Sequence, residues 1–353
     1  MSAPDEISTP GWDAIDRALA PLYRDVTPRH FGTLIRHRLG GPDPLDGISA
    51  YPRDTPFPHW HFVTYGFTEL YGPEEDSGGN GFGFELTFRL ARQDNEAEPP
   101  MWALSFLQNL ARYVFGSGNR FKVGDHLNCN SPLSFDHPTD LRAVLFAKDT
   151  ELGPIEAEHG SAEFLQVVGI TLDELTAVQA WNGARFTELM RMRIPLLGTE
   201  LARRSILSDP AVAETVRIEI EREGSSTGLL FVSTLQWRRR RSIFRAEQVE
   251  LTIGAGQAEV IASVLRGRLP HGRELQLSGQ NFSVRFVPAT TRDVQSSKQQ
   301  LELHLTREAA MELSAKLLPR SVRFALDHFP ALRVIIEPTK VTDANGRVVE
   351  TIG

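Results

Sequence analysis

The sequence predicts an α+β protein of two domains, each with a mainly antiparallel or mixed sheet flanked by helices. First, the chain has 353 residues, about twice the common size of a single domain. Second, strand-like and helix-like runs are interspersed without the regular alternation of a doubly wound parallel sheet. Third, the Gly/Ser/Thr-rich stretch Glu223–Gly228 separates two strand-like runs and reads as a short linker. We therefore expect domains at residues 1–223 and 224–353.

The first domain contains the clearest periodic patterns. Apolar and other residues alternate from Phe82 to Leu90, which predicts a strand with one buried face. A helix is expected from Pro10 to about Tyr23, with Thr9 as its cap. A second helix, beginning after Pro100 and stopped by Gly116, carries apolar residues at i, i+3, i+4 and i+7.

Further elements follow from shorter signals. Thr171 and Glu174 form a capping-box pattern that opens a helix ending near Trp181. Apolar runs predict additional strands at 59–67, 141–147, 164–170, 216–220, 229–237, 274–277, 283–287, 301–305 and 332–337. Helices are expected at 257–266 and 307–317 in the second domain.

Charge and composition exclude several classes of function. The formal net charge is -7 at pH 7, which argues against nucleic acid as a direct partner. The basic run Arg238–Arg241 could meet an acidic protein or nucleic acid, but a solvated turn is the favoured interpretation. A single cysteine precludes an intrachain disulfide and fits a reducing compartment. The acidic N-terminus lacks a signal-peptide core, and no run is apolar enough for a membrane span, so we expect a cytoplasmic protein without membrane contact.

The candidate chemical motifs each favour a structural role. His59 and His61 point the same way on a strand, yet no further ligand stands at a familiar spacing, so packing is favoured over metal binding. The glycine-rich stretch Gly78–Gly83 precedes a strand, whereas a phosphate loop leads into a helix. Cys129 lacks a partner base, and no GxSxG motif is present. We expect no enzyme activity, no cofactor, no metal and no catalytic residue.

Several ordered segments carry a resemblance to a known family. They are 39–46, 58–61, 81–90, 110–115, 124–126, 164–169, 181–183, 265–269 and 271–273. In these segments the chain resembles Suppressor of fused, the negative regulator of Hedgehog signalling, and its bacterial relatives. The resemblance extends from about Gly11 into the C-terminal half and is densest between residues 39 and 183.

The resemblance implies a non-enzymatic adaptor that captures an extended peptide of a partner protein in an interdomain cleft. It implies that Tyr113 and Asp125 receive a histidine of that peptide, with Phe121 as a neighbouring pocket aromatic. Leu229 and Phe231 would supply the contribution of the second domain. Considered without the resemblance, Tyr113 merely packs and Asp125 caps a turn after Gly124.

The sequence also departs from the animal members of the family. They carry a long disordered insert in the second domain, whereas the segment from Trp237 to Gln248 is short here. The regulation that is linked to that insert in animal members is therefore in doubt for this chain. The sequence does not identify the physiological partner. An alternative function is that of a bacterial immunity protein, which would neutralise a toxin through a folded-surface interface.

Overall fold

The structure is a computed structural model. It describes residues 9–35, 37, 40–71, 81–93, 96–158, 160–240, 248–342 and 347–353. The chain forms two compact units. Unit 1 comprises the residues up to Leu175 together with Gly183–Ser208, and unit 2 comprises Thr176–Asn182 and Asp209–Gly353. Both units mix helices with sheets, which confirms the predicted α+β class.

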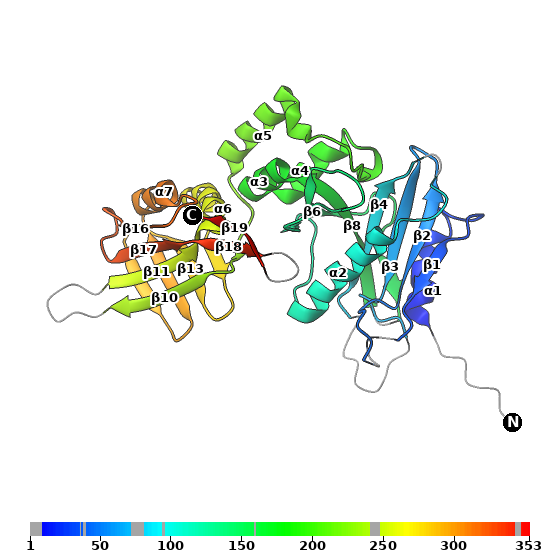
Figure 1. Cartoon of the computed structure of the whole chain (residues 1–353), viewed down its shortest axis with the longest axis horizontal. Helices are drawn as coiled ribbons and strands as arrows, with labels where there is room; N and C mark the ends of the chain where they lie inside the picture. The colour runs from blue at the N-terminus through cyan, green and yellow to red at the C-terminus, as the bar shows by residue number, and fades with distance from the viewer. Residues whose placement is uncertain are drawn as a thin grey trace. The chain divides into compact units, whose positions relative to one another are not determined.

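Unit 1 is built on one eight-stranded mixed sheet (Figure 1). Its strands are β1 (Arg29–Gly32), β2 (Gly47–Arg53), β3 (His59–Tyr65), β4 (Phe84–Ala91), β5 (His126–Asn128), β6 (Leu141–Lys148), β7 (Ile155–Ala157) and β8 (Gly160–Thr171). The order is β1-β2-β3-β4-β8-β6-β5, and β7 pairs with β8 outside this path. Only the β4–β8 pair is parallel among these described strands.

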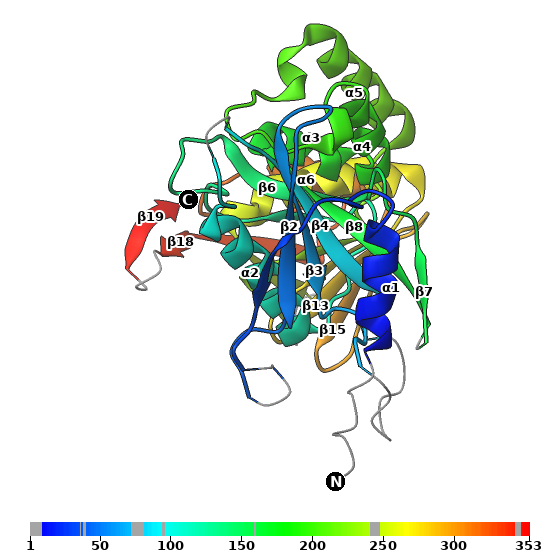
Figure 2. The same ribbon diagram turned by 90° about the vertical axis from the view of Figure 1, so that its right-hand side faces the viewer.

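Helices cover both faces of this sheet. Unit 1 contains α1 (Pro10–Leu19), α2 (Met101–Ser117) and α4 (Gly183–Arg191), with short 3-10 turns η2 (Pro195–Leu197) and η3 (Ile206–Ser208). Helix α3 (Leu172–Ala180) begins in unit 1 and belongs to unit 2 from Thr176 onward. Figure 2 shows α1 and α2 on opposite sides of the sheet. The apolar stripe of α2 packs against Phe84, Leu86 and Phe88 of β4. On the other face, Ile15 and Leu19 of α1 pack against residues of β3 and β8.

Strand β4 differs from its prediction in one respect that shapes the unit. The alternation is present, but both faces are buried rather than one. Glu85, Thr87 and Arg89 are each 0% exposed. Strand β4 lies between β3 and β8, with α2 on one face and α1 packed against those two neighbouring strands on the other. Its polar side chains therefore point into the protein and need partners there.

The ends of two predicted helices also differ. Thr9 precedes α1, but its side chain makes no capping hydrogen bond. Helix α2 continues past Gly116 to Ser117, and Gly118 ends it with a positive φ of 73°. A left-handed residue at this position lets the backbone N–H of Gly118 reach the carbonyl of Val114, which glycine permits without a steric cost.

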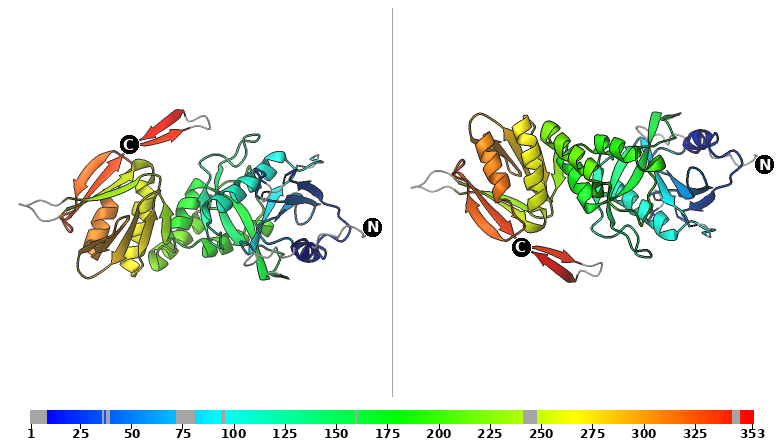
Figure 3. Two further views of the ribbon diagram at one scale, coloured as in Figure 1. Left: turned by 90° about the horizontal axis from the view of Figure 1, so that it is seen from below. Right: turned by 90° about the horizontal axis from the view of Figure 1, so that it is seen from above.

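Unit 2 contains two sheets and a terminal hairpin (Figure 3). The four-stranded sheet has the order β10-β11-β17-β16, the five-stranded sheet has the order β14-β15-β13-β12-β9, and β18 pairs with β19. The strands are β9 (Leu229–Phe231), β10 (Leu235–Arg240), β11 (Gln248–Gly254), β12 (Leu275–Ser278), β13 (Ser283–Pro288), β14 (Asp293–Ser296), β15 (Gln300–Leu305), β16 (Val322–Ala325), β17 (Leu332–Glu337), β18 (Thr339–Thr342) and β19 (Val348–Ile352).

The helices of unit 2 join both sheets into one core. They are α5 (Pro210–Glu223), α6 (Ala255–Arg268), the 3-10 turn η4 (Leu269–His271) and α7 (Arg307–Lys316). Apolar residues of α6 and α7, such as Ile261 and Leu313, share a single buried cluster with Leu251 of one sheet and Leu277 of the other. Neither helix is long and apolar enough to cross a membrane, and the same holds for every other described helix.

Two strand predictions near the expected linker are wrong. Residues 216–220 belong to helix α5, and the run 229–237 divides into β9 and β10, which lie in different sheets. The flexible-linker interpretation of the Glu223–Gly228 stretch does not hold either. Ser225 is fully buried, and its hydroxyl donates to the carbonyl of Gln179 over 2.5 Å. The stretch is therefore packed within unit 2, together with α5.

A boundary between separately folding domains at residue 223/224 stays a prediction. Contacts between residues divide the chain earlier, at Ser208/Asp209, and also assign Thr176–Asn182 to unit 2. Leu39, Gly78–Asn80, Arg241 and the first eight residues of the chain lie outside the described residues.

Candidate binding site

Two of the predicted site residues stack on each other at the end of α2. Tyr113 is half-buried, and its ring lies parallel to that of Phe121 with centroids 5.7 Å apart. Phe121 in turn stacks on Phe146 of β6 at 3.9 Å. Phe121 is only 8% exposed and belongs to the core, so it supports Tyr113 rather than forming an open wall. The Tyr113 hydroxyl accepts a hydrogen bond from Asn119.

Asp125 is exposed and begins the segment that leads into β5. Its Oδ2 accepts a hydrogen bond from the backbone N–H of Lys122 over 2.8 Å, so the carboxylate does cap a turn. Its carbonyl oxygen accepts the N–H of Phe146, the residue on which Phe121 stacks. Although much of the residue is exposed, neighbouring atoms partly desolvate the carboxyl and raise the pKa of Asp125, and the bond from Lys122 opposes that rise. The backbone of β6 thus holds Asp125 near the Tyr113–Phe121 stack.

Two glycines from separate resembling segments hold the Asp125 loop in place. Gly124 has a φ of +90°, and its carbonyl oxygen lies against Gly183 at the start of α4. A Cβ on Gly183 would stand 2.1 Å from that oxygen, which no side chain tolerates. This close approach explains physically why a loop and a distant helix start both require glycine.

Strand β5, which follows Asp125, is the last strand of the sheet at one edge. The bonds to β6 use the carbonyl of Asp125 and the N–H of Cys129. Because hydrogen bonding alternates along a strand, the backbone groups of His126 and Asn128 point away from β6, toward the open edge. The described part of unit 1 contains no strand beyond this edge.

Unit 2 contains an edge of similar character at β9. This strand ends its sheet and pairs in parallel with β12. Its inward bonds use the carbonyl of Gly228 and the N–H of Val232, so the backbone groups of Leu229 and Phe231 point away from β12. The carbonyl of Phe231 accepts a hydrogen bond from the side chain of Gln257 in α6 over 3.1 Å, so the edge is partly occupied at that position. The side chains of Leu229 and Phe231 are 44% and 53% exposed, while Leu230 is buried. Exposed apolar side chains beside a free edge are typical of a surface that pairs with another strand.

The two histidines of β3 lie in the core of unit 1, as predicted. Both are 0% exposed. Nδ1 of His59 lies 2.7 Å from the carbonyl of Phe57, and Nδ1 of His61 lies 2.5 Å from the hydroxyl of Tyr23. Burial lowers the pKa of His59 to about 4 and lowers that of His61 as well, so both rings are neutral near pH 7. The described residues contain no group of three or more side chains arranged to hold a metal ion.

The remaining candidates have structural surroundings. Arg238 and Arg240 stand on β10 rather than in a turn, and both pair with Glu250, at 2.6 and 3.0 Å. Burial raises the pKa of the Cys129 thiol to about 12, which keeps it protonated and unreactive. Gly81 lies in a turn that precedes β4.

Sequence reasoning missed the backbone contribution of β5. A three-residue strand is too short to show a period, so neither His126 nor Asn128 stood out. The available signal was the pair Gly124 and Asp125, a turn dipeptide directly before a short apolar-polar run.

Comparisons with known proteins agree with this architecture. The family profile described as "Suppressor of fused protein (SUFU)" matches residues 41–204. The human protein named "Suppressor of fused homolog" is 38% identical over 236 residues, which are 61% of this chain and 48% of the human protein. The mouse protein of the same name is 37% identical over 235 residues. The matched stretch thus spans about half the length of these curated relatives.

Two solved structures extend the comparison. The crystal structure of Drosophila Suppressor of Fused covers 95% of this chain and 99% of its own, with a TM-score of 0.77 and 22% identity, and this shows the shared fold. A chain from the crystal structure of the Sufu–Fu complex is 30% identical and matches with a TM-score of 0.56. The match covers 60% of this chain and 98% of that one. From the sequence identity and the shared fold together, the chain belongs to the Suppressor of fused family.

Proposed function

We propose that this protein is a non-enzymatic adaptor that binds an extended segment of a partner protein by strand addition. The observation that carries the proposal is that β5 and β9 each end a sheet, and that each is bordered by residues suited to ligand contact. At β9 an added strand would displace the Gln257 side chain from the Phe231 carbonyl. Strand addition draws its affinity from main-chain hydrogen bonds and its specificity from alternate side chains. A solved complex of a family member, Sufu–Fu, supports the assignment to protein binding.

Asp125 is the proposed specificity residue at the β5 edge. One oxygen of its carboxylate is taken by the N–H of Lys122, and the side chain stays exposed. An exposed carboxylate beside the half-buried ring of Tyr113 favours a cationic or hydrogen-bonding side chain on the partner, such as histidine. Leu229 and Phe231 are the proposed apolar contacts at the β9 edge.

Asp125→Asn is the variant that separates binding from folding. Asparagine keeps an oxygen that accepts the Lys122 N–H but removes the charge. We expect affinity for the partner segment to fall by roughly 1.5–3 kcal/mol, the range for a hydrogen bond to a charged group, with little change in melting temperature. The matched control is Asp136→Asn, another exposed aspartate of unit 1, which should alter neither quantity.

The partner segment is obtained by selecting a displayed peptide library on the purified protein and measuring affinities by calorimetry. Replacing Leu229 or Phe231 with serine should weaken the same peptide without unfolding the protein, because both side chains are already exposed. N-methylation at alternate peptide residues should abolish binding if main-chain pairing carries it. A loss of stability in Asp125→Asn with unchanged affinity would assign the residue to the fold alone. If the library yields no peptide and affinity capture from the native host yields a folded toxin, the immunity alternative would be favoured.

A further inference from the structure

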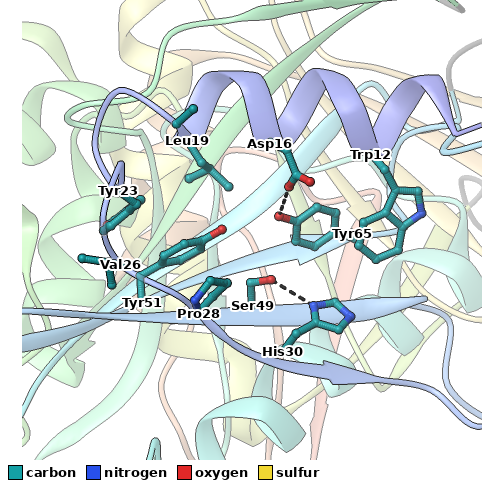
Figure 4. Close-up of a pocket in the computed structure, with 11 residues that line it drawn as sticks. Trp12, Asp16, Leu19, Tyr23, Val26, Pro28, His30, Ser49, Tyr51 and Tyr65 are labelled. Atoms are coloured by element: carbon teal, nitrogen blue, oxygen red, sulfur yellow. Dashed lines mark hydrogen bonds between the residues drawn. The ribbon is translucent and has the colours of Figure 1, made fainter.

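A separate pocket lies on the α1 side of the sheet in unit 1. It is bounded by α1 above and by β1, β2 and β3 below, and has a volume of about 370 Å³ (Figure 4). This volume falls within the usual range of small-ligand sites. The pocket shares no lining residue with the β5 edge or with the Tyr113 stack.

Aromatic rings form much of the pocket wall. Trp12 of α1 stacks on Tyr65 of β3 with ring centroids 4.3 Å apart, and the ring of His30 meets both of them edge-on. Tyr51 of β2 stacks on Tyr23, which extends the wall at the other end. The faces of such rings carry partial negative charge, which attracts cations.

A carboxylate completes the pocket. Oδ1 of Asp16 accepts a hydrogen bond from the Tyr65 hydroxyl over 2.8 Å, which fixes the side chain at the rim. Oδ2 has no hydrogen bond to any described residue, and the side chain is exposed. The lower wall is held by a 3.0 Å hydrogen bond between His30 and Ser49.

Asp16 is the one fully charged side chain among the described residues that line the pocket. Arg53 lies behind the wall, 5.8 Å from the centroid of the Tyr23 ring, where it pairs with Glu151. None of the eleven described residues that line it is lysine or arginine. Partial burial lowers the pKa of His30, although Asp16 opposes this, so the imidazole is neutral near pH 7. The lining therefore combines one carboxylate with π faces and hydroxyl oxygens and supplies no cation of its own to that carboxylate, because Arg53 lies at the Tyr23 end and pairs with Glu151.

We propose that this pocket binds an organic ammonium group, with Asp16 supplying the counter-charge and the Trp12, Tyr51 and Tyr65 rings supplying the cation-attracting wall. Quaternary ammonium ligands are recognised by this combination of aromatic faces and an acid. The same group can be presented by a free small molecule or by a methylated lysine side chain. The competing explanation is a hydrated hollow between α1 and the sheet, which would show no preference for charge.

A pair of isosteres tests the proposal on the unmodified protein. Choline and 3,3-dimethylbutan-1-ol have the same shape, but only choline is charged. Binding is followed through the indole N–H resonance of Trp12, assigned with a Trp12→Phe variant. We expect choline to shift this resonance saturably and to bind about tenfold more tightly than the neutral isostere, consistent with a partly desolvated cation–π contact. Equal affinities, or no saturable shift with choline, would overturn the proposal.

A pair of variants tests whether the Asp16 carboxylate is the charge that attracts the cation. Asp16→Asn keeps an acceptor for the Tyr65 hydroxyl and should weaken choline binding about tenfold while leaving the neutral isostere unchanged. Asp13→Asn, which removes an exposed charge from the same helix outside the pocket, should have no effect. Equal losses in both variants would mean that surface charge in general, and not this pocket, attracts the cation. Titration with N-acetyl-trimethyllysine amide then distinguishes the two sources, since tighter binding than choline assigns the pocket to a modified side chain.

Discussion

At the scale of single residues, the buried polar side chains of β4 depend on partners that arrive from elsewhere in unit 1. Arg89 donates to Asp149 through both terminal nitrogens, at 2.7 and 3.1 Å, and also to Gln166 and Glu151. Burial by itself would raise the pKa of Asp149, but the charge and hydrogen bonds of Arg89 lower it overall. A buried ion pair of this kind is tolerated because neighbours satisfy most of its lone pairs and protons. The Nε of Arg89 is the exception, since it is buried and has no hydrogen-bond partner among the described residues.

Glu85, on the same face of β4, accepts hydrogen bonds from neutral groups of the described residues and from no cationic side chain among them. Its Oε1 accepts from the N–H groups of Gly66 and Thr68 and from the Thr68 hydroxyl, and its Oε2 lies 2.6 Å from the hydroxyl of Thr64. Burial raises the pKa of Glu85 to about 7, although these hydrogen bonds oppose the rise. The folded protein therefore retains a proton here that the unfolded chain releases at lower pH.

The linkage gives a prediction with a definite sign. A carboxyl whose pKa is raised on folding makes the free energy of unfolding fall as pH increases from the unfolded value of about 4.5 to the folded value of about 7. We expect a loss on the order of 3 kcal/mol across this window, since each unit of pKa difference is worth about 1.4 kcal/mol.

Glu85→Gln isolates the effect from other titrating groups. The amide preserves an acceptor for Gly66 and Thr68 and can donate to the Thr64 hydroxyl, as a protonated glutamic acid would. Urea denaturation of both proteins between pH 4.5 and pH 8 measures the difference. The stability of Glu85→Gln relative to the unmodified chain should rise through this window, and parallel curves would show that Glu85 ionises normally.

At the scale of elements, the sequence predicted the longer, strongly periodic segments and failed where two patterns compete. Residues 216–220 alternate β-branched with charged side chains and so were assigned to a strand. In the structure they belong to α5, where Asp209 accepts the N–H of Ala211, Pro210 opens the helix and Arg217 pairs with Glu214 and Glu221. Those helix signals were in the sequence, but the alternation obscured them.

The sequence predicts the part of the candidate site that depends on local periodicity, and it does not predict the part that depends on tertiary packing. The position of Tyr113 off the buried stripe of α2 follows from the helical period, and the structure shows it half-buried. The burial of Phe121 and the polar face of β4 could not be foreseen, because both depend on which distant segments pack over them. Only tertiary contacts decide whether an alternating strand exposes or encloses its polar residues.

The contact between the Gly124 loop and α4 supports a prediction at this scale. Gly183→Ala would place a methyl group 2.1 Å from the carbonyl oxygen of Gly124, so the loop that carries Asp125 must move. We expect a destabilisation of about 1–3 kcal/mol, typical of overpacking, together with weaker binding of any ligand at Asp125. Denaturation and hydrogen exchange of the His126–Asn128 amides measure the two effects.

Gly116→Ala is the matched control. Gly116 lies within α2, and a Cβ there meets nothing within 4 Å. Alanine should therefore stabilise the protein by about 0.5–1 kcal/mol through its higher helix propensity. Equal effects of the two substitutions would mean that the Gly124–Gly183 approach does not constrain the loop.

At the scale of the whole molecule, the chain has two cores of different construction. Unit 1 encloses the polar network of β4 between helices and a single sheet, whereas unit 2 is held by one apolar cluster shared by two sheets, α6 and α7. The boundary at residue 223/224 stays a prediction, but the stretch on which it rests is not an exposed linker, because Ser225 is buried by contacts distant in sequence. Such contacts are invisible to a search for Gly/Ser-rich stretches.

We expect the two cores to unfold independently of each other. Arg89→Met leaves Asp149 buried without its partner and should destabilise unit 1 by about 3–5 kcal/mol. Arg112→Met, which removes an exposed ion pair with Asp43, should cost at most about 1 kcal/mol. Hydrogen exchange followed by mass spectrometry reads the two units separately. If each unit folds as its own module, Arg89→Met lowers protection in β4 and β8 and leaves β11 and β17 unchanged. An equal loss of protection in both pairs of strands would show instead that the chain unfolds as one cooperative unit, and the prediction of two separately folding domains would then be wrong.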